Sequence, residues 1–292
     1  MSTMPASQMG SIVRKPLDSE IDVHGITHRG LVRETNQDQF LIGSLRKRMD
    51  VFMTSLPPAS ATPPGTERLA FLAMVADGVG GAAAGEDASR LAVSAITNYI
   101  AHSTHCYYTA DASDDAAFAN ALADAAMECH ATLTSDAASD PAHHGMATTL
   151  TLWLGVWPRA YVLQVGDSRY YLFRDSELTQ VSRDQTMAQE LVDRGLISRT
   201  EASHSRWSHV LSSAIGGPQT TPVVTGIEQE WGDVHLLCSD GLTKHVSDDR
   251  IREHLLAMET ARGTCEALLQ DALDAGGTDN ITIVVGRAIA RE

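Results

Sequence analysis

The chain has 292 residues, 43% of them hydrophobic, and a formal net charge of −15 at pH 7, which allows one large or two small domains with a sizeable core. The acidic balance argues against a nucleic-acid partner, because binding to a phosphate backbone requires a basic surface. We expect a cytoplasmic protein without a membrane partner, because residues 1–20 lack a signal-peptide run, no stretch of about 18 apolar residues could span a bilayer, and the four cysteines form no C-x-x-C pair.

The predicted elements follow from apolar runs, helical periodicity and turn-forming residues. The N-terminal part is expected to contain a disordered tail at 1–20, strands at 21–30 and 36–43, an irregular insertion rich in Pro, Ser, Ala and Thr at 55–67, and a strand at 69–76. The middle part is expected to contain helices at 86–101 and 114–134, followed by strands at 147–157, 160–167, 169–175 and 177–182. A polar segment at 184–217 with a short helix at 185–195 comes next, then strands at 223–230 and 234–241, a helical region at 248–275 and a strand at 280–289. Regular βαβ order is missing and no linker divides the chain. We therefore expect one α+β domain over 21–290, built from antiparallel sheets covered by helices.

Four aspartates lie at the ends of predicted strands. Asp77, Asp167 and Asp240 each end an apolar run, and Asp279 lies just ahead of one. One such Asp is typical of a turn, but four converging carboxylates would repel each other, by about 4 kcal/mol for each pair about 4 Å apart at an effective dielectric near 20. Ligands that are all oxygen suit Mg²⁺, Mn²⁺ or Ca²⁺. The pattern therefore predicts a carboxylate-held metal site.

The glycines after Asp77 support the same interpretation. Gly78 allows close backbone approach, so that its carbonyl could face an ion. The alternative is a dinucleotide-binding loop, because residues 78–83 match G-x-G-x-x-A. Against it, Asp77 would repel a pyrophosphate, and Asn98 stands where an acid would bind the ribose.

Other phosphatase chemistries fit the sequence less well. A cysteine phosphatase needs an arginine six residues after its cysteine. The residues at these positions are Ala112, Ser135, Lys244 and Asp271. A calcineurin-like metallophosphoesterase combines D-x-H, G-D and N-H-[DE] elements. Residues 22–25 (DVHG) and 232–235 (GDVH) are similar to the first element, but no N-H-[DE] follows. This class stays as a weaker alternative.

Eight short motifs occur together in one order. They are RETNQD (33–38), VADGVGG (75–81), GMATTL (145–150), GDSR (166–169), LTQVSRDQT (178–186), LSSAIGG (211–217), CSDGLT (238–243) and TDN (278–280). In this order they resemble the motifs of the metal-dependent type 2C (PPM) protein Ser/Thr phosphatases, in the bacterial branch of that family. The resemblance covers about residues 21–290.

The resemblance implies a four-layer αββα sandwich of two antiparallel sheets flanked by helices, with two Mn²⁺ or Mg²⁺ ions at one end. In that arrangement Asp77 bridges the two ions. Asp240 and Asp279 complete the coordination of the first ion, the Gly78 carbonyl contacts the second, and Asp38 holds a water molecule on the metal.

The resemblance also implies an activity and its partners. Arg33 would bind the substrate phosphate, and a metal-activated water would hydrolyse phosphoserine or phosphothreonine without a covalent enzyme intermediate. Residues 184–217 match the flap region of the family, where Trp207 either anchors the segment or simply packs. The expected partners are phosphoproteins and a cognate bacterial Ser/Thr kinase, with the chain itself a monomer. The alternative on the same fold is a non-catalytic phosphoprotein-binding or regulatory module.

Four positions depart from the family pattern. Val79 stands where many relatives carry a His proposed as general acid, Gln37 replaces an acid, and Ala147 replaces a glycine. Relatives can hold a third ion near the residue that matches Asp167, with help from an acid four residues after the one that matches Asp240. Lys244 occupies that position here, so we expect its ammonium near the third ion, and a third site that is weak or absent.

Overall fold

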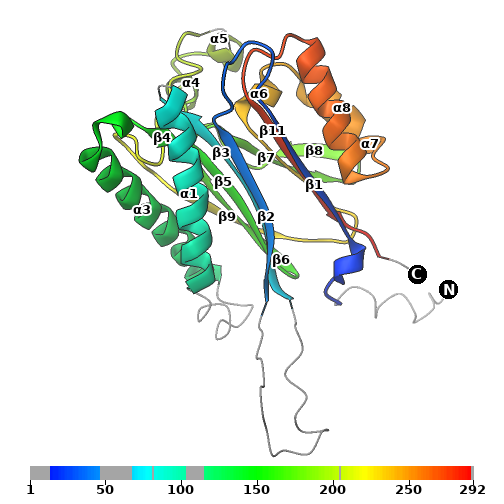
Figure 1. Ribbon diagram of the computed structural model, residues 1–292. Helices are drawn as coiled ribbons and strands as arrows, with labels where there is room; N and C mark the ends of the chain where they lie inside the picture. Colours follow the sequence, from blue (N-terminus) through cyan, green and yellow to red (C-terminus); the bar gives the residue numbers. More distant parts are fainter. Residues whose placement is uncertain (1–13, 47–67, 81, 103–114, 204, 291–292) are drawn as a thin grey trace, which may run out of the picture.

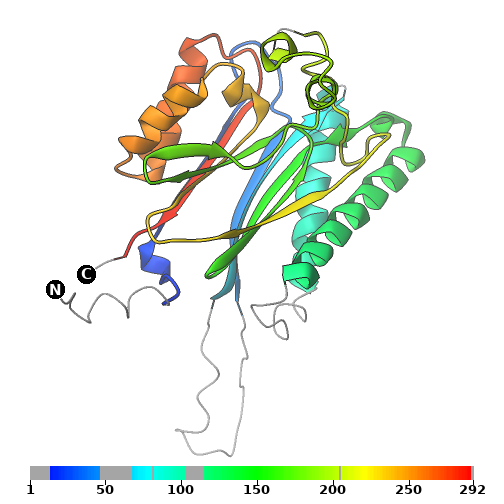
Figure 2. The same ribbon diagram turned by 180° about the vertical axis from the view of Figure 1, so that it is seen from behind.

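Two antiparallel sheets pack face to face between two pairs of helices, as Figures 1 and 2 show from opposite sides. The computed structural model describes residues 14–46, 68–80, 82–102, 115–203 and 205–290. The expected α+β class and its four-layer αββα architecture are confirmed. In these ranges, no helix combines the length and apolarity needed to cross a membrane.

The first sheet holds the N-terminal and C-terminal strands side by side. Its strands, in spatial order, are β1 (Ile21–His28), β11 (Ile281–Ala288), β10 (Val234–Cys238), β7 (Arg169–Arg174) and β8 (Glu177–Gln180). Helices α7 (Asp248–Leu256) and α8 (Ala261–Asp274) cover its outer face (Figure 1). The region expected as one helical stretch at 248–275 is therefore two helices. Thr260 starts the second by accepting a hydrogen bond from the Gly263 N–H, as N-cap threonines do.

The second sheet is formed from the middle of the chain. Its strands, in spatial order, are β2 (Asp38–Arg46), β3 (Arg68–Val79), β5 (Leu150–Val156), β6 (Arg159–Val165) and β9 (Val223–Glu228), and the short β4 (Ala147–Thr148) pairs with the end of β3. Helices α1 (Ala82–His102) and α3 (Asp115–Ser139) cover its outer face (Figure 1).

Strand β3 is apolar on both faces because both faces are covered. Leu72 and Met74 pack toward α1 and α3, whereas Ala73 and Val75 lie in the core between the two sheets with Trp153 of β5. Successive side chains of a strand point to opposite faces, so a strand in the middle of four layers reads as a continuous apolar run. This burial fixes β3 and thereby the position of Asp77 near its end.

Composition predicted a disordered tail over residues 1–20. Residues 14–20 contradict that prediction. Residues Asp18–Glu20 form a 3₁₀ turn, and the buried Glu20 accepts two hydrogen bonds of 2.7 Å from Arg14. The contact joins residues six apart, which local composition does not reveal. The rest of the predicted tail and the insertion predicted at 55–67 lie outside the described residues.

Candidate metal centre

Asp38 and Asp77 are brought together by the pairing of β2 with β3, in which they are direct antiparallel partners. The backbone of Asp77 is held by the TTL stretch of the GMATTL motif. Its N–H donates to Thr149 Oγ1 over 3.0 Å, and its carbonyl accepts from Thr148 Oγ1 and from the Thr149 N–H over 2.9 Å each. The Asp77 side chain is therefore placed by backbone contacts that do not depend on its carboxylate.

Asp38 links the two sheets. It is 1% exposed, and its Oδ2 accepts a 2.7 Å hydrogen bond from Ser239 Oγ at the end of β10. Ser239 Oγ in turn accepts from the Thr282 N–H of β11 over 2.9 Å. Burial raises the pKa of Asp38 to about 7, although the Ser239 hydrogen bond opposes the shift. Within the part of the chain that the structure describes, its second oxygen, Oδ1, is buried without a hydrogen-bond partner and is available to a further ligand.

The glycine of each Asp-Gly pair sits where two backbones touch. A Cβ on Gly78 would lie 2.1 Å from the Gly85 carbonyl oxygen in α1, and a Cβ on Gly241 would lie 1.9 Å from the Asn280 carbonyl oxygen. Neither position leaves room for a methyl group. The Gly78 carbonyl was predicted to face an ion, and the close contact with α1 gives a second reason for glycine at that position.

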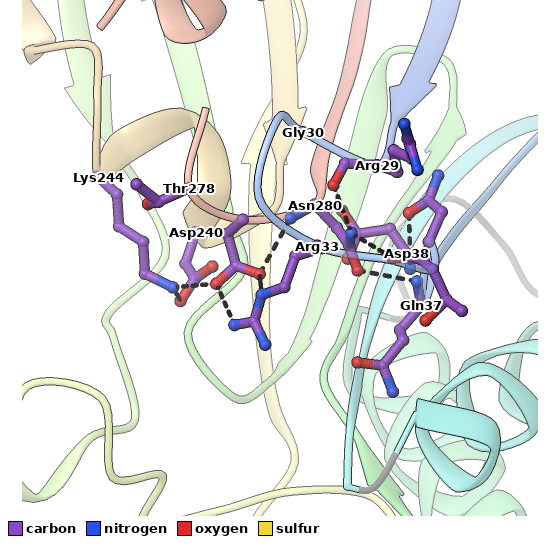
Figure 3. Close-up of polar contacts among 12 residues, drawn as sticks. Arg29, Gly30, Arg33, Gln37, Asp38, Asp240, Lys244, Thr278 and Asn280 are labelled. Carbon is purple, nitrogen blue, oxygen red and sulfur yellow. Dashed lines mark hydrogen bonds and ion pairs between the residues drawn. The ribbon is translucent and has the colours of Figure 1, made fainter. Parts of the chain in front are cut away.

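Asp240 and Asp279 face two cationic side chains (Figure 3). Lys244 Nζ lies 2.6 Å from Asp240 Oδ2 and 2.7 Å from Asp279 Oδ2. Arg33 Nε lies 2.8 Å from Asp279 Oδ1. Burial alone would raise the pKa of Asp279, but the hydrogen bonds from Lys244 and Arg33 outweigh it and lower the pKa. Asp240 also keeps one buried oxygen, Oδ1, that has no hydrogen-bond partner among the described residues.

Asn280 organises the loop that carries Arg33, a role that the sequence reasoning missed. Its amide Nδ2 donates to the carbonyls of Arg29 and Thr35 over 2.9 Å each, and its Oδ1 accepts from the Gln37 N–H over 2.8 Å (Figure 3). All hydrogen-bonding atoms of this 4% exposed amide are thus used to fix one loop. The only sequence signal was its place beside Asp279 in the TDN motif.

The negative charges of the other four predicted acids act on the carboxyl group of Asp77. Burial first, and then the negative charges of Asp38, Asp240, Asp167 and Asp279, raise its pKa well above the usual range. The charges of these four acids thus act on Asp77, and their role as metal ligands stays a prediction. Within the described ranges, no three His, Cys, Asp or Glu side chains are gathered tightly enough to hold an ion as they stand. The all-oxygen donors and the two buried oxygens without partners nevertheless fit a hard divalent cation.

The comparisons with known proteins decide the family. A sequence profile of the protein phosphatase 2C family matches residues 65–275. The chain belongs to the protein phosphatase 2C family.

Curated relatives and solved structures agree with this assignment. Serine/threonine protein phosphatase PstP of Mycobacterium tuberculosis is 36% identical over 264 residues, which are 89% of this chain and 44% of PstP. The chain thus spans less than half the length of that relative. Serine/threonine phosphatase stp of Listeria monocytogenes is 30% identical over 215 residues, covering 73% of this chain and 83% of the relative.

The fold of this phosphatase 2C chain matches that of solved relatives. A crystal structure of the M. tuberculosis PstP/Ppp phosphatase has 32% identity and a TM-score of 0.73, covering 92% of this chain and 99% of that chain. The catalytic domain of PstP in complex with two manganese ions has 32% identity and a TM-score of 0.68, with the same coverage. The family is metal-dependent, in agreement with the donor set described above.

Asp167 lies beside the acid cluster of this phosphatase 2C chain, on the turn after β6. Burial raises its pKa to about 8, with further contributions from Asp240 and Asp184, whereas Lys244 opposes the shift. The preceding Gly166 has a φ of +101°, and a Cβ there would lie 2.6 Å from the Thr149 side chain. The same threonine that holds Asp77 thus requires glycine before Asp167.

The predicted flap region, 184–217, contacts the Asp167 turn. The Gln185 N–H donates to the Gly166 carbonyl over 3.0 Å, and the Gly166 N–H donates to Gln185 Oε1 over 2.8 Å. The region contains α4 (Met187–Asp193) and α5 (Arg199–Ser203), which lie at the same end of the sandwich as α6 (Asp240–Thr243) (Figure 1). Trp207 is 39% exposed. The Arg206 guanidinium lies over its indole ring, with Arg206 Cζ 4.7 Å from the ring centroid.

Two departures from the family pattern have structural outcomes. Ala147 lies in β4 opposite Val79 and is not among the residues with positive φ, so its side chain is tolerated there. Lys244 was expected beside the third-ion position at Asp167. Its ammonium forms ion pairs with Asp240 and Asp279, because Lys244 lies one helical turn after Asp240 and on the same side. Its charge also opposes the rise in the pKa of Asp167.

Proposed function

We propose that this chain is a metal-dependent protein Ser/Thr phosphatase that hydrolyses phosphoserine and phosphothreonine in proteins. The observation that supports the proposal is geometric: Asp38 and Asp77 are direct partners on β2 and β3, and Asp240 and Asp279 lie 2.6 Å and 2.7 Å from the same ammonium of Lys244. Membership of the protein phosphatase 2C family and the Ser/Thr phosphatase names of two bacterial relatives support it.

We assign the metal ligands as the resemblance suggested. Asp77 would bridge two ions, Asp240 and Asp279 would hold the first, the Gly78 carbonyl would face the second, and Asp38 would hold a water at the site. Mn²⁺ and Mg²⁺ both suit oxygen ligands. When bound, two such ions supply a water of lowered pKa and neutralise both ends of an in-line displacement.

The side chains of the protein bind and orient the phosphate. The guanidinium of Arg33 is planar and matches phosphate oxygens in pairs, and Asn280 holds the loop that carries it. Burial raises the pKa of the Cys238 thiol to about 12, so this thiol is protonated at neutral pH and is a poor nucleophile. Val79 is without a transferable proton, so the leaving oxygen takes its proton from water or from another group at the site.

The substrates are proposed to be phosphoproteins produced by a cognate Ser/Thr kinase in the cytoplasm, on which the chain acts as a monomer. A non-catalytic phosphoprotein-binding module on this fold is the second candidate. It would keep the acid cluster for binding alone and would not require the Arg33 loop to contact a scissile phosphate. Membership of the protein phosphatase 2C family argues against a calcineurin-like esterase.

Phosphate release from a phosphothreonine peptide tests the proposal. The purified chain is expected to release phosphate with Mn²⁺, to stop in EDTA, and to recover when excess Mn²⁺ is added. A matched phosphotyrosine peptide serves as the control and should be hydrolysed much more slowly. Binding of the phosphothreonine peptide without release at any Mn²⁺ or Mg²⁺ concentration would favour the non-catalytic module.

Arg33→Ala is expected to weaken phosphate binding. Loss of one charge-assisted hydrogen-bonding group costs about 1.5–3 kcal/mol, which corresponds to a decrease in kcat/KM of about 10-fold to 150-fold, seen mainly as a raised KM. Arg29→Ala is the control, because Arg29 lies exposed on the same loop and contacts Asn280 through its backbone carbonyl. Unchanged kcat and KM in Arg33→Ala would show that Arg33 does not contact the phosphate.

A further inference from the structure

The ammonium of Lys244 lies between the carboxylates of Asp240 and Asp279, which the proposed function assigns to the first ion (Figure 3). It follows the short helix α6 as its C-cap residue, and the Lys244 N–H donates to the Asp240 carbonyl over 2.8 Å. This backbone bond holds the lysine directly beside Asp240. The Lys244 side chain is 24% exposed, and those of Asp240 and Asp279 are 19% and 16% exposed. The two carboxylates are therefore largely covered, whereas Lys244 as a whole residue is exposed to solvent.

Both carboxylate oxygens of Asp279 accept hydrogen bonds from neighbouring groups. Its Oδ1 accepts from Arg33 Nε over 2.8 Å and from the Asn280 N–H over 3.0 Å. Its Oδ2 accepts from Arg33 Nη2 over 3.0 Å and from Lys244 Nζ over 2.7 Å. Ligating carboxylates commonly keep other hydrogen bonds, but a divalent ion on Oδ2 would be repelled by the ammonium that lies 2.7 Å from the same oxygen. Ion binding at Oδ2 therefore favours movement of Lys244 away from it.

Lys244 differs from Arg33 in how it engages the pair. The Arg33 side chain is 51% exposed, and among the described residues its ion pair is with Asp279 alone, whereas Lys244 bridges Asp279 and Asp240. A single ammonium between two carboxylates does electrostatically what a first ion would do, because it offsets their mutual repulsion. It also carries no empty coordination positions, so it cannot hold a water or a phosphate oxygen as a ligand.

We propose that Lys244 is an internal counter-cation that bridges Asp240 and Asp279 and competes with the first divalent ion for them. The proposal rests on the assignment of these two aspartates as ligands in the proposed function. Ion binding then requires the side chain to leave, which sets a higher ion concentration for activity. If the bridge is closed for about 90% of the time, the apparent Kd of the ion is raised about tenfold.

Calorimetric titration of the full chain with Mn²⁺ tests the competition. Lys244→Met keeps the length and packing of the side chain and removes its charge, and it is expected to lower the Kd of the tightest Mn²⁺ site about tenfold. Arg262→Met is the matched control, because Arg262 is an exposed cation paired with Glu266 on α8, and it changes the net charge by the same amount. The control Kd is expected to stay within about twofold of the wild type, since exposed charges more than a Debye length away are screened.

Thermal unfolding gives a second readout that does not depend on activity. In EDTA, Lys244→Met is expected to unfold at a lower temperature than the wild type, because Asp240 and Asp279 then repel each other without a cation. Saturating Mn²⁺ should remove that difference, since the ion replaces the ammonium. If Lys244→Met does not fold in EDTA, Lys244→Gln provides the same comparison with a neutral donor that still reaches the carboxylates.

The outcomes separate this proposal from the proposed function. Equal Kd values for the wild type, Lys244→Met and Lys244→Gln would overturn the competition, even with full phosphatase activity. A tenfold lower Kd in Lys244→Met, with no phosphate release by any variant, would support the competition and overturn the enzymatic function. A Kd lowered equally in Arg262→Met would also overturn the proposed competition, because the effect would then be one of net charge.

Discussion

Asp77→Asn is expected to abolish Mn²⁺-dependent phosphate release while the fold is retained. The carboxamide has nearly the shape of the carboxylate but carries no charge, and only one of its two terminal atoms can ligate a cation. Loss of a bridging ligand should lower kcat by at least about 10³-fold, or about 4 kcal/mol in activation free energy. The fold should persist, because Thr148 and Thr149 hold Asp77 through its backbone.

The same substitution has a diagnostic effect on stability. Burial and the surrounding acids raise the pKa of Asp77, which means that its ionised form is unfavourable in the folded chain without a cation. Asp77→Asn should therefore unfold in EDTA at the same temperature as the wild type or higher, and should gain less from Mn²⁺. Asp249→Asn, at an exposed position in the first turn of α7, is the control. Wild-type activity in Asp77→Asn would refute the two-ion assignment.

Gly241→Ala is expected to destabilise the chain strongly. The added Cβ would lie 1.9 Å from the Asn280 carbonyl oxygen, a backbone atom that cannot rotate away. Small-to-large substitutions in packed positions cost about 1–3 kcal/mol, occasionally more. The shift would also displace Asp240 and the Asn280 side chain, which fixes the Arg33 loop, so activity should fall along with stability.

Urea unfolding measures the effect of Gly241→Ala. Gly43→Ala is the control, because a Cβ there meets only ordinary contacts, the nearest being Leu41 Cδ2 at 3.5 Å. Both substitutions remove the same backbone freedom from the unfolded chain, so their difference isolates the steric contact. A Gly241→Ala chain as stable as Gly43→Ala would show that α6 and the start of β11 can move apart without cost.

Local sequence patterns predicted the elements that periodicity and burial determine. The apolar run at 69–76 is β3, and it is apolar throughout because both of its faces are covered. The chain order of strands and helices predicted antiparallel layers covered by helices, and the acids at strand ends predicted a carboxylate cluster. These signals are readable in the sequence because each depends on neighbours within a few residues.

The tertiary structure alone decided which side chains contact each other within that cluster. Ser239 donates to Asp38 across 201 positions of sequence, and Arg33 pairs with Asp279 across 246. Lys244 pairs with Asp240 and Asp279, whereas the sequence predicted only that its ammonium lies near the third-ion position at Asp167. A charged side chain adopts the contacts that the packed backbones leave within its reach, and the positions of those backbones follow from the whole fold. The sequence by itself therefore predicted a carboxylate site and its acidic residues, and the packing of the two sheets determined which side chains each of these acids contacts.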